Sequence, residues 1–169
     1  MSWGQCLIDI IYANENYFES FHKALNIVAK ERLYIEMIEA PPLKNVSEFQ
    51  RGLISKNGPV YYAIENQTVV GWCDIFPEDN PRQSHRGSLG MGLLPAYRGK
   101  GIGSRLLEAV LAHAKSFGLE KVELNVYTSN VAAIALYKKM GFVEEGLLKK
   151  YRKLDGIYYD CIVMAKEIL

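Results

Sequence analysis

The sequence has little cysteine and no long hydrophobic run. Its three cysteines, Cys6, Cys73 and Cys161, are far apart in 169 residues and show no paired metal-ligand spacing. Each lies among apolar residues, which favours buried, reduced thiols. No apolar run approaches the roughly 20 residues that a membrane helix needs, and the N-terminus lacks the features of a secretory signal. We therefore expect a reduced, cytoplasmic compartment, with no membrane partner and no metal site.

The sequence also lacks an excess of either charge. Lysine and arginine number 20 and aspartate and glutamate number 19, so the formal net charge is +1. This balance argues against a nucleic-acid partner bound by bulk electrostatics, and against a disordered, self-repelling chain. The hydrophobic share of 49% is ordinary for a globular protein. The length suits one compact domain, so we expect a single domain over residues 1–169.

The hydrophobic patterns predict elements in the order β-α-α-β-β-β-α-β-α-β-β. Strands are predicted at residues 6–12, 59–65, 68–76, 88–94, 121–127, 142–150 and 157–166. Helices are predicted at residues 15–32, from just after Ser47, at about 103–117 and at 131–140. The dipeptides Asn66-Gln67 and Asp155-Gly156 are hairpin turn signals.

The segment 88–127 contains a strand, a glycine-rich turn, a helix and a second strand. Such a unit forms a right-handed crossover between parallel strands. The remaining strands look antiparallel. The predicted fold is therefore a mixed α/β fold, with a mostly antiparallel central sheet flanked by helices and one parallel β-α-β crossover.

The glycine-rich turn, residues 97–104 (YRGKGIGS), places three alternating glycines directly before a helix. Glycine allows positive φ and close approach of a ligand, so successive backbone N–H groups can converge on an anion at the helix N-terminus. Arg98 and Lys100 add positive charge. These features predict a phosphate or pyrophosphate ligand.

Other interpretations of this turn stay open at this point. The nucleoside triphosphate motif G-x-x-x-x-G-K-[ST] is absent, and the dinucleotide motif G-x-G-x-x-G lacks its third glycine. Glu123 does lie at a suitable distance downstream for a ribose contact. However, a dinucleotide-binding fold has further parallel strands where this chain ends in a hairpin. A turn that is glycine-rich for packing alone is the remaining alternative.

A second pattern lies on the helix at 131–140. Asn130 and Tyr137 are seven residues apart, so they project from nearly the same face, roughly 10 Å apart along the axis. Ala133 lies between them and leaves room for an extended ligand. Taken alone, the pattern is better explained by a helix-capping asparagine and a core tyrosine.

Together, the two patterns resemble the GNAT superfamily of acyl-CoA-dependent N-acyltransferases. Residues 93–107 match its Arg/Gln-x-x-Gly-x-Gly/Ala motif at Arg98, Gly101 and Gly103. Residues 124–142 match its Asn-x-x-Ala-x-x-Leu-Tyr-x-x-x-Gly-Phe motif. The matched positions of this second motif are Asn130, Ala133, Leu136, Tyr137, Gly141 and Phe142. The resemblance covers about residues 59–166.

The resemblance implies acetyl-CoA as co-substrate, with its pantetheine arm between the strands at 88–94 and 121–127. The residues that it implies for cofactor binding are Met91, Gly92, Leu93, Arg98, Gly99, Lys100, Gly101, Ile102, Gly103, Ser104, Asn130, Ala133 and Tyr137. An amine would attack the thioester directly through a tetrahedral intermediate. The backbone N–H of Leu93 would stabilise the oxyanion, and Tyr137 would act as general acid toward the leaving thiolate.

The general base is not identified by this resemblance. Some family members carry a glutamate where this chain has Asn125, whose amide cannot accept the proton. A water chain or a carboxylate, Asp74 or Glu36, would have to do so. Cys73 as a covalent nucleophile is disfavoured because nothing in the sequence pairs it with a base, and His85 lies in a polar loop.

The acceptor is expected to be a small-molecule amine or a peptide or protein amine. The resemblance implies that the walls of the acceptor-binding region come from Tyr34–Met37 and from the turn Asp155–Tyr159. The alternative function is a non-catalytic acyl-CoA-binding module. A homodimer is possible because dimers are common in the family.

Overall fold

The computed structural model describes residues 7–169, so Cys6, the first residue of the strand predicted at 6–12, lies outside it. The strands are β1 (Asp9–Tyr12), β2 (Val60–Glu65), β3 (Thr68–Pro77), β4 (Arg86–Leu93), β5 (Lys121–Tyr127), β6 (Val143–Leu154) and β7 (Ile157–Glu167). The helices are α1 (Phe18–Lys30), α2 (Leu43–Ser55), α3 (Ile102–Phe117) and α4 (Val131–Lys139). This order confirms the predicted one.

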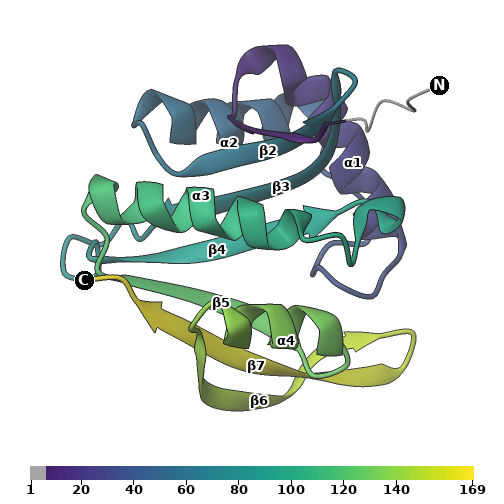
Figure 1. Ribbon diagram of the computed structural model, residues 1–169. Helices are drawn as coiled ribbons and strands as arrows, with labels where there is room; N and C mark the ends of the chain where they lie inside the picture. The colour runs from purple at the N-terminus through teal and green to yellow at the C-terminus, as the bar shows by residue number, and fades with distance from the viewer. Residues whose placement is uncertain (1–6) are drawn as a thin grey trace.

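The strands form one seven-stranded sheet in the order β1-β2-β3-β4-β5-β7-β6 (Figure 1). Every neighbouring pair is antiparallel except β4 and β5, which α3 connects as a parallel crossover. The predicted fold class, mostly antiparallel with one parallel pair, is therefore confirmed.

Both predicted hairpin turns have the backbone that their residues favour. Asn66 and Gln67 adopt φ of 47° and 63° between β2 and β3. Asp155 and Gly156 adopt φ of 50° and 81° between β6 and β7. Two consecutive positive φ values match the twist of the flanking strands, so these short turns fix the register of each hairpin.

The predicted start of α2 is wrong. The helix begins at Leu43, directly after Pro42, and not after Ser47. Proline has no backbone N–H group, but the first N–H groups of a helix have no partner within the helix. Pro42 is therefore compatible with this position. The predicted helix at 15–32 is also shorter in the structure, because Glu15–Tyr17 form a 3-10 turn before α1.

The sheet separates two hydrophobic cores. Helices α3 and α4, in front of the sheet in Figure 1, cover one face, where Leu106 of α3 belongs to the same core as Val122 and Leu124 of β5. Helices α1 and α2 cover the opposite face, where Phe21 packs against Tyr62. Alternate residues of each strand therefore face different helices, as the pleat of a strand requires.

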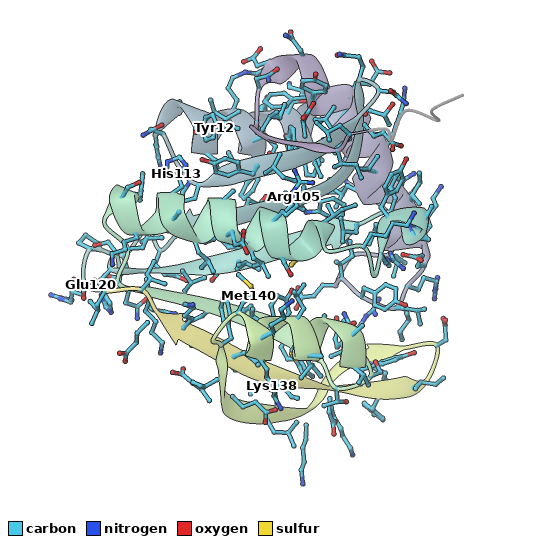
Figure 2. All side chains as sticks on the ribbon, viewed as in Figure 1. Tyr12, Arg105, His113, Glu120, Lys138 and Met140 are labelled. Atoms are coloured by element: carbon cyan, nitrogen blue, oxygen red, sulfur yellow. The ribbon has the colours of Figure 1, made fainter. Side chains whose placement is uncertain are left out.

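Aromatic residues at the β1 edge of the sheet pack against α3. Figure 2 shows Tyr12 of β1 near His113 of α3, and their ring centroids are 5.5 Å apart. Tyr61 also contacts the imidazole Nδ1 of His113 at 3.2 Å. These contacts hold the C-terminal half of α3 against the β1 edge of the sheet.

Over residues 7–169, none of the helices combines the length and the hydrophobicity that a bilayer crossing needs. Cys73 and Cys161 are buried and free, as predicted.

Candidate active site

The site begins where the two parallel strands part. β4 and β5 pair only from Arg86 to Ser88 against Lys121 to Glu123. Beyond these residues β4 continues to pair with β3 and β5 with β7, so the two strands diverge, as Figure 1 shows. The free edges of β4 and β5 border a cavity of about 1380 Å³.

The cavity brings together most of the residues that the sequence singled out. The predicted cofactor residues that line it are Met91, Gly92, Leu93, Arg98, Gly99, Gly101, Gly103, Ser104, Asn130, Ala133 and Tyr137. The three predicted substrate residues, Glu36, Asp74 and Asn125, line it as well.

Two predicted cofactor residues direct their side chains elsewhere. Ile102 is only 2% exposed and packs in the core beneath α3. The Lys100 ammonium lies 5.8 Å from the centroid of the Tyr97 ring. These two positions can therefore contribute backbone N–H groups more readily than side chains.

The three glycines of the turn have different physical roles. Gly99 and Gly101 adopt φ of 71° and 79°, and a Cβ at either would have no heavy atom within 4 Å. They are needed for the left-handed backbone, beside open space that a ligand can enter. A Cβ at Gly103, in contrast, would lie 2.9 Å from Leu136 of α4. Packing alone therefore accounts for one glycine of the three.

The Arg98 side chain is held by the protein itself. Its Nη1 and Nη2 donate to the Glu31 carboxylate at 3.0 and 2.5 Å, and its Nε donates to the Leu93 carbonyl at 3.0 Å. The guanidinium also lies 4.6 Å from the centroid of the Tyr34 ring. Arg98 therefore connects the glycine turn to β4 and to the end of α1.

The backbone of Leu93 is oriented toward the gap. The N–H of Leu94 donates to the Val70 carbonyl on the β3 side, at 2.9 Å. Since consecutive N–H groups of an extended strand point to opposite sides, the Leu93 N–H is directed away from β3. That direction is the side on which β5 has separated.

Asn130 and Tyr137 occupy the two ends of α4. The Asn130 side-chain oxygen accepts from the Ala133 N–H at 3.3 Å and caps the helix, while its amide nitrogen is a separate donor. Tyr137 is buried and packs against Phe142, with ring centroids 5.7 Å apart. Burial, together with Cys73 nearby, raises the pKa of the Tyr137 phenol, so it is protonated at neutral pH.

A buried polar chain reaches the cavity from the α2 side. Gln50 Nε2 donates to Asp74 Oδ2 at 3.2 Å, and the Tyr62 hydroxyl donates to Gln50 Oε1 at 2.7 Å. Asp74 is 7% exposed and Gln50 is 1% exposed. Burial raises the pKa of the Asp74 carboxyl to about 6, although the Gln50 hydrogen bond opposes this shift.

A second polar chain crosses the cavity nearer to solvent. The Tyr151 hydroxyl of β6 donates to Glu36 and accepts from Asn125 Nδ2 at 3.4 Å. The hydrogen bond to Glu36 is the main cause that raises the pKa of Tyr151 to about 12. This chain connects the segment between α1 and α2 to β5 and β6.

The cavity therefore passes from one face of the sheet to the other. Tyr137 belongs to the core on the α3 and α4 face, with Met91 and Leu93 packed against it. Asp74 and its partners Gln50 and Tyr62 lie on the α1 and α2 face. The arrangement can hold two ligands that approach from opposite faces and meet between β4 and β5.

The predicted walls of the acceptor region are correct at one end and wrong at the other. Tyr34–Met37 line the cavity. The turn Asp155–Tyr159 is not part of the lining, and Asp155 instead forms an exposed ion pair with Arg32 at 2.5 Å. The final hairpin instead contributes Tyr151, Cys161 and Val163.

Sequence reasoning missed Gln50, although the sequence contains a signal for it. Gln50 follows Val46 by four residues and precedes Leu53 by three, which places it on the apolar face of α2. A polar side chain in such a stripe needs a buried partner. Trp72, Phe49 and Tyr151 were also missed, since aromatic residues in strands and helices carry no signal that separates a cavity from a core.

Neither nucleophilic cysteine chemistry nor a metal centre is supported by these residues. Burial raises the pKa of Cys73 well above its usual value, and Asp74 adds to the effect, so its thiolate is disfavoured. Among the residues that the structure describes, no group of three or more His, Cys, Asp or Glu side chains could hold a metal ion.

Comparison with protein families defines the class of this chain. The model of the acetyltransferase (GNAT) family matches residues 21–142. The chain therefore belongs to the GNAT acetyltransferase family, and the predicted resemblance is confirmed.

Individual relatives are consistent with this family. The chain is 36% identical to the N-alpha-acetyltransferase RimI of Mycobacterium tuberculosis over 119 residues, which are 70% of this chain and 72% of the relative. It is 33% identical to the L-amino acid N-acetyltransferase AaaT of Escherichia coli over 99 residues. That second match spans 58% of this chain and 61% of the relative, less than two thirds of its length.

Solved structures share the fold. A GNAT-family acetyltransferase from Streptococcus pneumoniae superposes with a TM-score of 0.89 and 26% identity, over 96% of this chain and 100% of that chain. The protein yncA from Salmonella typhimurium, solved with its cofactor acetyl-CoA, superposes with a TM-score of 0.91 over 96% of this chain and 95% of its own. At 18% identity, the second comparison concerns the fold alone.

Proposed function

We propose that this chain transfers the acetyl group of acetyl-CoA to an amine by direct attack through a tetrahedral intermediate. The observation that carries the proposal is the cavity between β4 and β5. It joins an open, left-handed glycine turn to a buried, protonated phenol and continues to the opposite face of the sheet. Membership of the GNAT acetyltransferase family supports the same reaction.

The cofactor would be held mainly by backbone groups. The N–H groups of residues 99–104 would bind the diphosphate, where the dipole of α3 adds to the attraction. Backbone groups of Met91 to Leu93 would bond to the pantetheine arm along the free edge of β4. The Asn130 amide nitrogen would donate to the same arm, and Ala133 is small enough to leave room for it.

Two groups would act on the reacting thioester. The Leu93 N–H, directed into the gap, would donate to the oxyanion of the tetrahedral intermediate. The Tyr137 hydroxyl would give its proton to the leaving thiolate. A phenol suits this role because the raised pKa keeps it protonated at neutral pH.

The acceptor would be the amine of a small molecule, a peptide or a protein. The names of two relatives, an L-amino acid N-acetyltransferase and an N-alpha-acetyltransferase, support an amine acceptor without choosing among these classes. Glu36, Asp74 and Asn125 would contact it from the α1 and α2 face. The single domain over residues 1–169, a cytoplasmic location and a homodimer belong to this proposal as further expectations.

The proposal is tested first by binding and then by transfer. Acetyl-CoA should raise the unfolding temperature of the protein by mass action, and NADH should not. CoA thiol should then be released when amines from a panel are added. Stabilisation by acetyl-CoA without thiol release from any amine is the result expected of the alternative, a non-catalytic acyl-CoA-binding module.

A further inference from the structure

Acetyl transfer requires a group that removes a proton from the acceptor, because a primary amine is an ammonium ion at neutral pH and has no free lone pair. Asn125 cannot do this, since an amide does not accept a proton at neutral pH. The carboxylates that line the cavity are Glu36, Asp74 and Glu123. These three carboxylates are therefore the side-chain candidates for the general base.

Two of these carboxylates are poorly suited. Burial opposes ionisation of Glu123, but Lys121 and Arg86 both bond to it and lower its pKa, which makes it a weaker base. Glu36 is exposed and accepts the hydroxyl hydrogen of Tyr151. Only Asp74 is both buried and free of an ion pair among the described residues.

The backbone opposite Asp74 leaves space for its carboxylate. Asp74 of β3 pairs with Gly90 of β4, and a Cβ at Gly90 would lie 3.0 Å from Asp74 Oδ1. Oδ1 therefore extends over the β4 backbone, at a residue that borders the gap. The other oxygen, Oδ2, is held by Gln50.

The groups that face Asp74 keep it oriented without neutralising it. Gln50 approaches from α2, Tyr62 from β2, and Cys73 is its neighbour on β3. None of the three carries a positive charge. The cation that β4 contributes to the cavity lining is Arg86, whose guanidinium is paired with Glu123 and Glu78.

We propose that Asp74 is the general base of acetyl transfer and that Gln50 is its positioning residue; the assignment rests on the function proposed above. An N–H bond of the ammonium breaks and its proton goes to Asp74 Oδ1. The freed lone pair forms the N–C bond at the thioester carbon, and collapse of the intermediate breaks the C–S bond. Sulfur takes the Tyr137 proton. The second proton lost by nitrogen returns to the phenolate through water, and Asp74 releases its proton to solvent.

The pKa of Asp74, raised by burial to about 6, agrees with this role. A carboxylate with this pKa is mostly ionised at pH 7 and accepts a proton more readily than an ordinary aspartate does.

The test compares pH profiles of kcat/KM from pH 5 to 9, with acetyl-CoA and an amine that the wild type accepts. The wild-type rate should fall below about pH 6. Asp74→Asn should lose this acid limb and transfer about 10²–10⁴-fold more slowly at pH 7. Asp79→Asn, an exposed aspartate outside the cavity, should keep the wild-type profile.

A double variant tests Gln50 without leaving a buried hydroxyl unpaired. Gln50→Met with Tyr62→Phe replaces both polar partners by apolar groups of similar shape. Because the Gln50 hydrogen bond lowers the pKa of Asp74, its loss should move the acid limb to higher pH. A merely structural role for Gln50 would leave the limb in place.

Three results overturn the assignment. An Asp74→Asn variant that folds and shows the wild-type limb and rate excludes Asp74 as the base. If Asp74→Asn does not fold, an unshifted limb in the double variant excludes it equally. A wild type that binds acetyl-CoA but acetylates no amine refutes the proposed function itself, and the assignment with it.

Discussion

Arg98 and Glu31 form a two-point ion pair between the glycine turn and the C-terminal end of α1. The two residues are 67 positions apart in the sequence, and their side chains are only 31% and 23% exposed. The pair joins the element that would hold the diphosphate to the segment that lines the other face of the cavity. This ion pair therefore couples the geometry of the two ligand regions.

Glu31→Gln should weaken this connection. The amide retains one hydrogen bond but loses the charge, so we expect a loss of roughly 1–2 kcal/mol in unfolding free energy and a several-fold weaker acetyl-CoA affinity. Urea unfolding and calorimetric titration measure the two effects. Glu48→Gln is the matched control, since Glu48 pairs with Lys44 only at 4.0 Å on an exposed helix face. Equal effects of both variants would contradict the coupling.

Tyr137→Phe should separate binding from transfer. The phenyl ring keeps the packing against Phe142, so the affinity for acetyl-CoA should stay near that of the wild type. The rate of transfer should fall by about 10²–10⁴-fold, because the thiolate loses its proton donor. Titration with acetyl-CoA and a thiol-release assay check the two halves. Wild-type turnover by the variant would remove Tyr137 from the chemistry.

Gly101→Ala should weaken cofactor binding beyond its effect on stability. Its φ of 79° costs an alanine roughly 1–2 kcal/mol, and the backbone change would also displace the N–H groups at the start of α3. Gly156→Ala is the control, because Gly156 has φ of 81° and equally open surroundings but lies in the β6–β7 turn. Both variants should lose similar unfolding free energy. Only Gly101→Ala should bind acetyl-CoA less tightly, and a similar loss for Gly156→Ala would count against the diphosphate site.

Asp74→Asn should become more stable relative to the wild type as the pH rises. The folded-state pKa of about 6 lies above the ordinary 3.8, so the folded protein holds this proton more tightly than the unfolded chain. The stability that Asp74 contributes is complete below about pH 3.8 and is lost as the pH rises through about 6. The asparagine variant has no such loss.

The difference in unfolding free energy between variant and wild type should therefore change by about 2 kcal/mol from pH 4 to pH 7. Urea unfolding of both proteins at several pH values measures this change. A flat difference for Asp74→Asn would show that the carboxyl is not desolvated in the folded protein.

Local patterns predicted most of the fold. The turns at Asn66-Gln67 and Asp155-Gly156, the parallel crossover and the apolar stripe of α3 depend on residues close together in sequence, so they could be inferred without a structure. The start of α2 could not, because a proline is compatible with both the end of one segment and the beginning of a helix.

The candidate site was predictable only where its residues lie in one segment. The glycine turn and the Asn130 to Tyr137 spacing are of this kind. The partners of Asp74 come from α2, β2 and β4, and the Glu36–Tyr151 contact joins residues 115 positions apart. Contacts of this kind depend on tertiary packing, which no local pattern encodes.

The central claim is tested most directly by following the acetyl group itself. Acetyl-CoA labelled with ¹³C in the acetyl carbonyl is incubated with the protein and an amine panel, and products are identified by mass spectrometry alongside a thiol assay. The account predicts that one amine or a small set gains the labelled acetyl group, with one CoA thiol released per product. Release of CoA thiol together with free labelled acetate, with every amine unchanged, would contradict it.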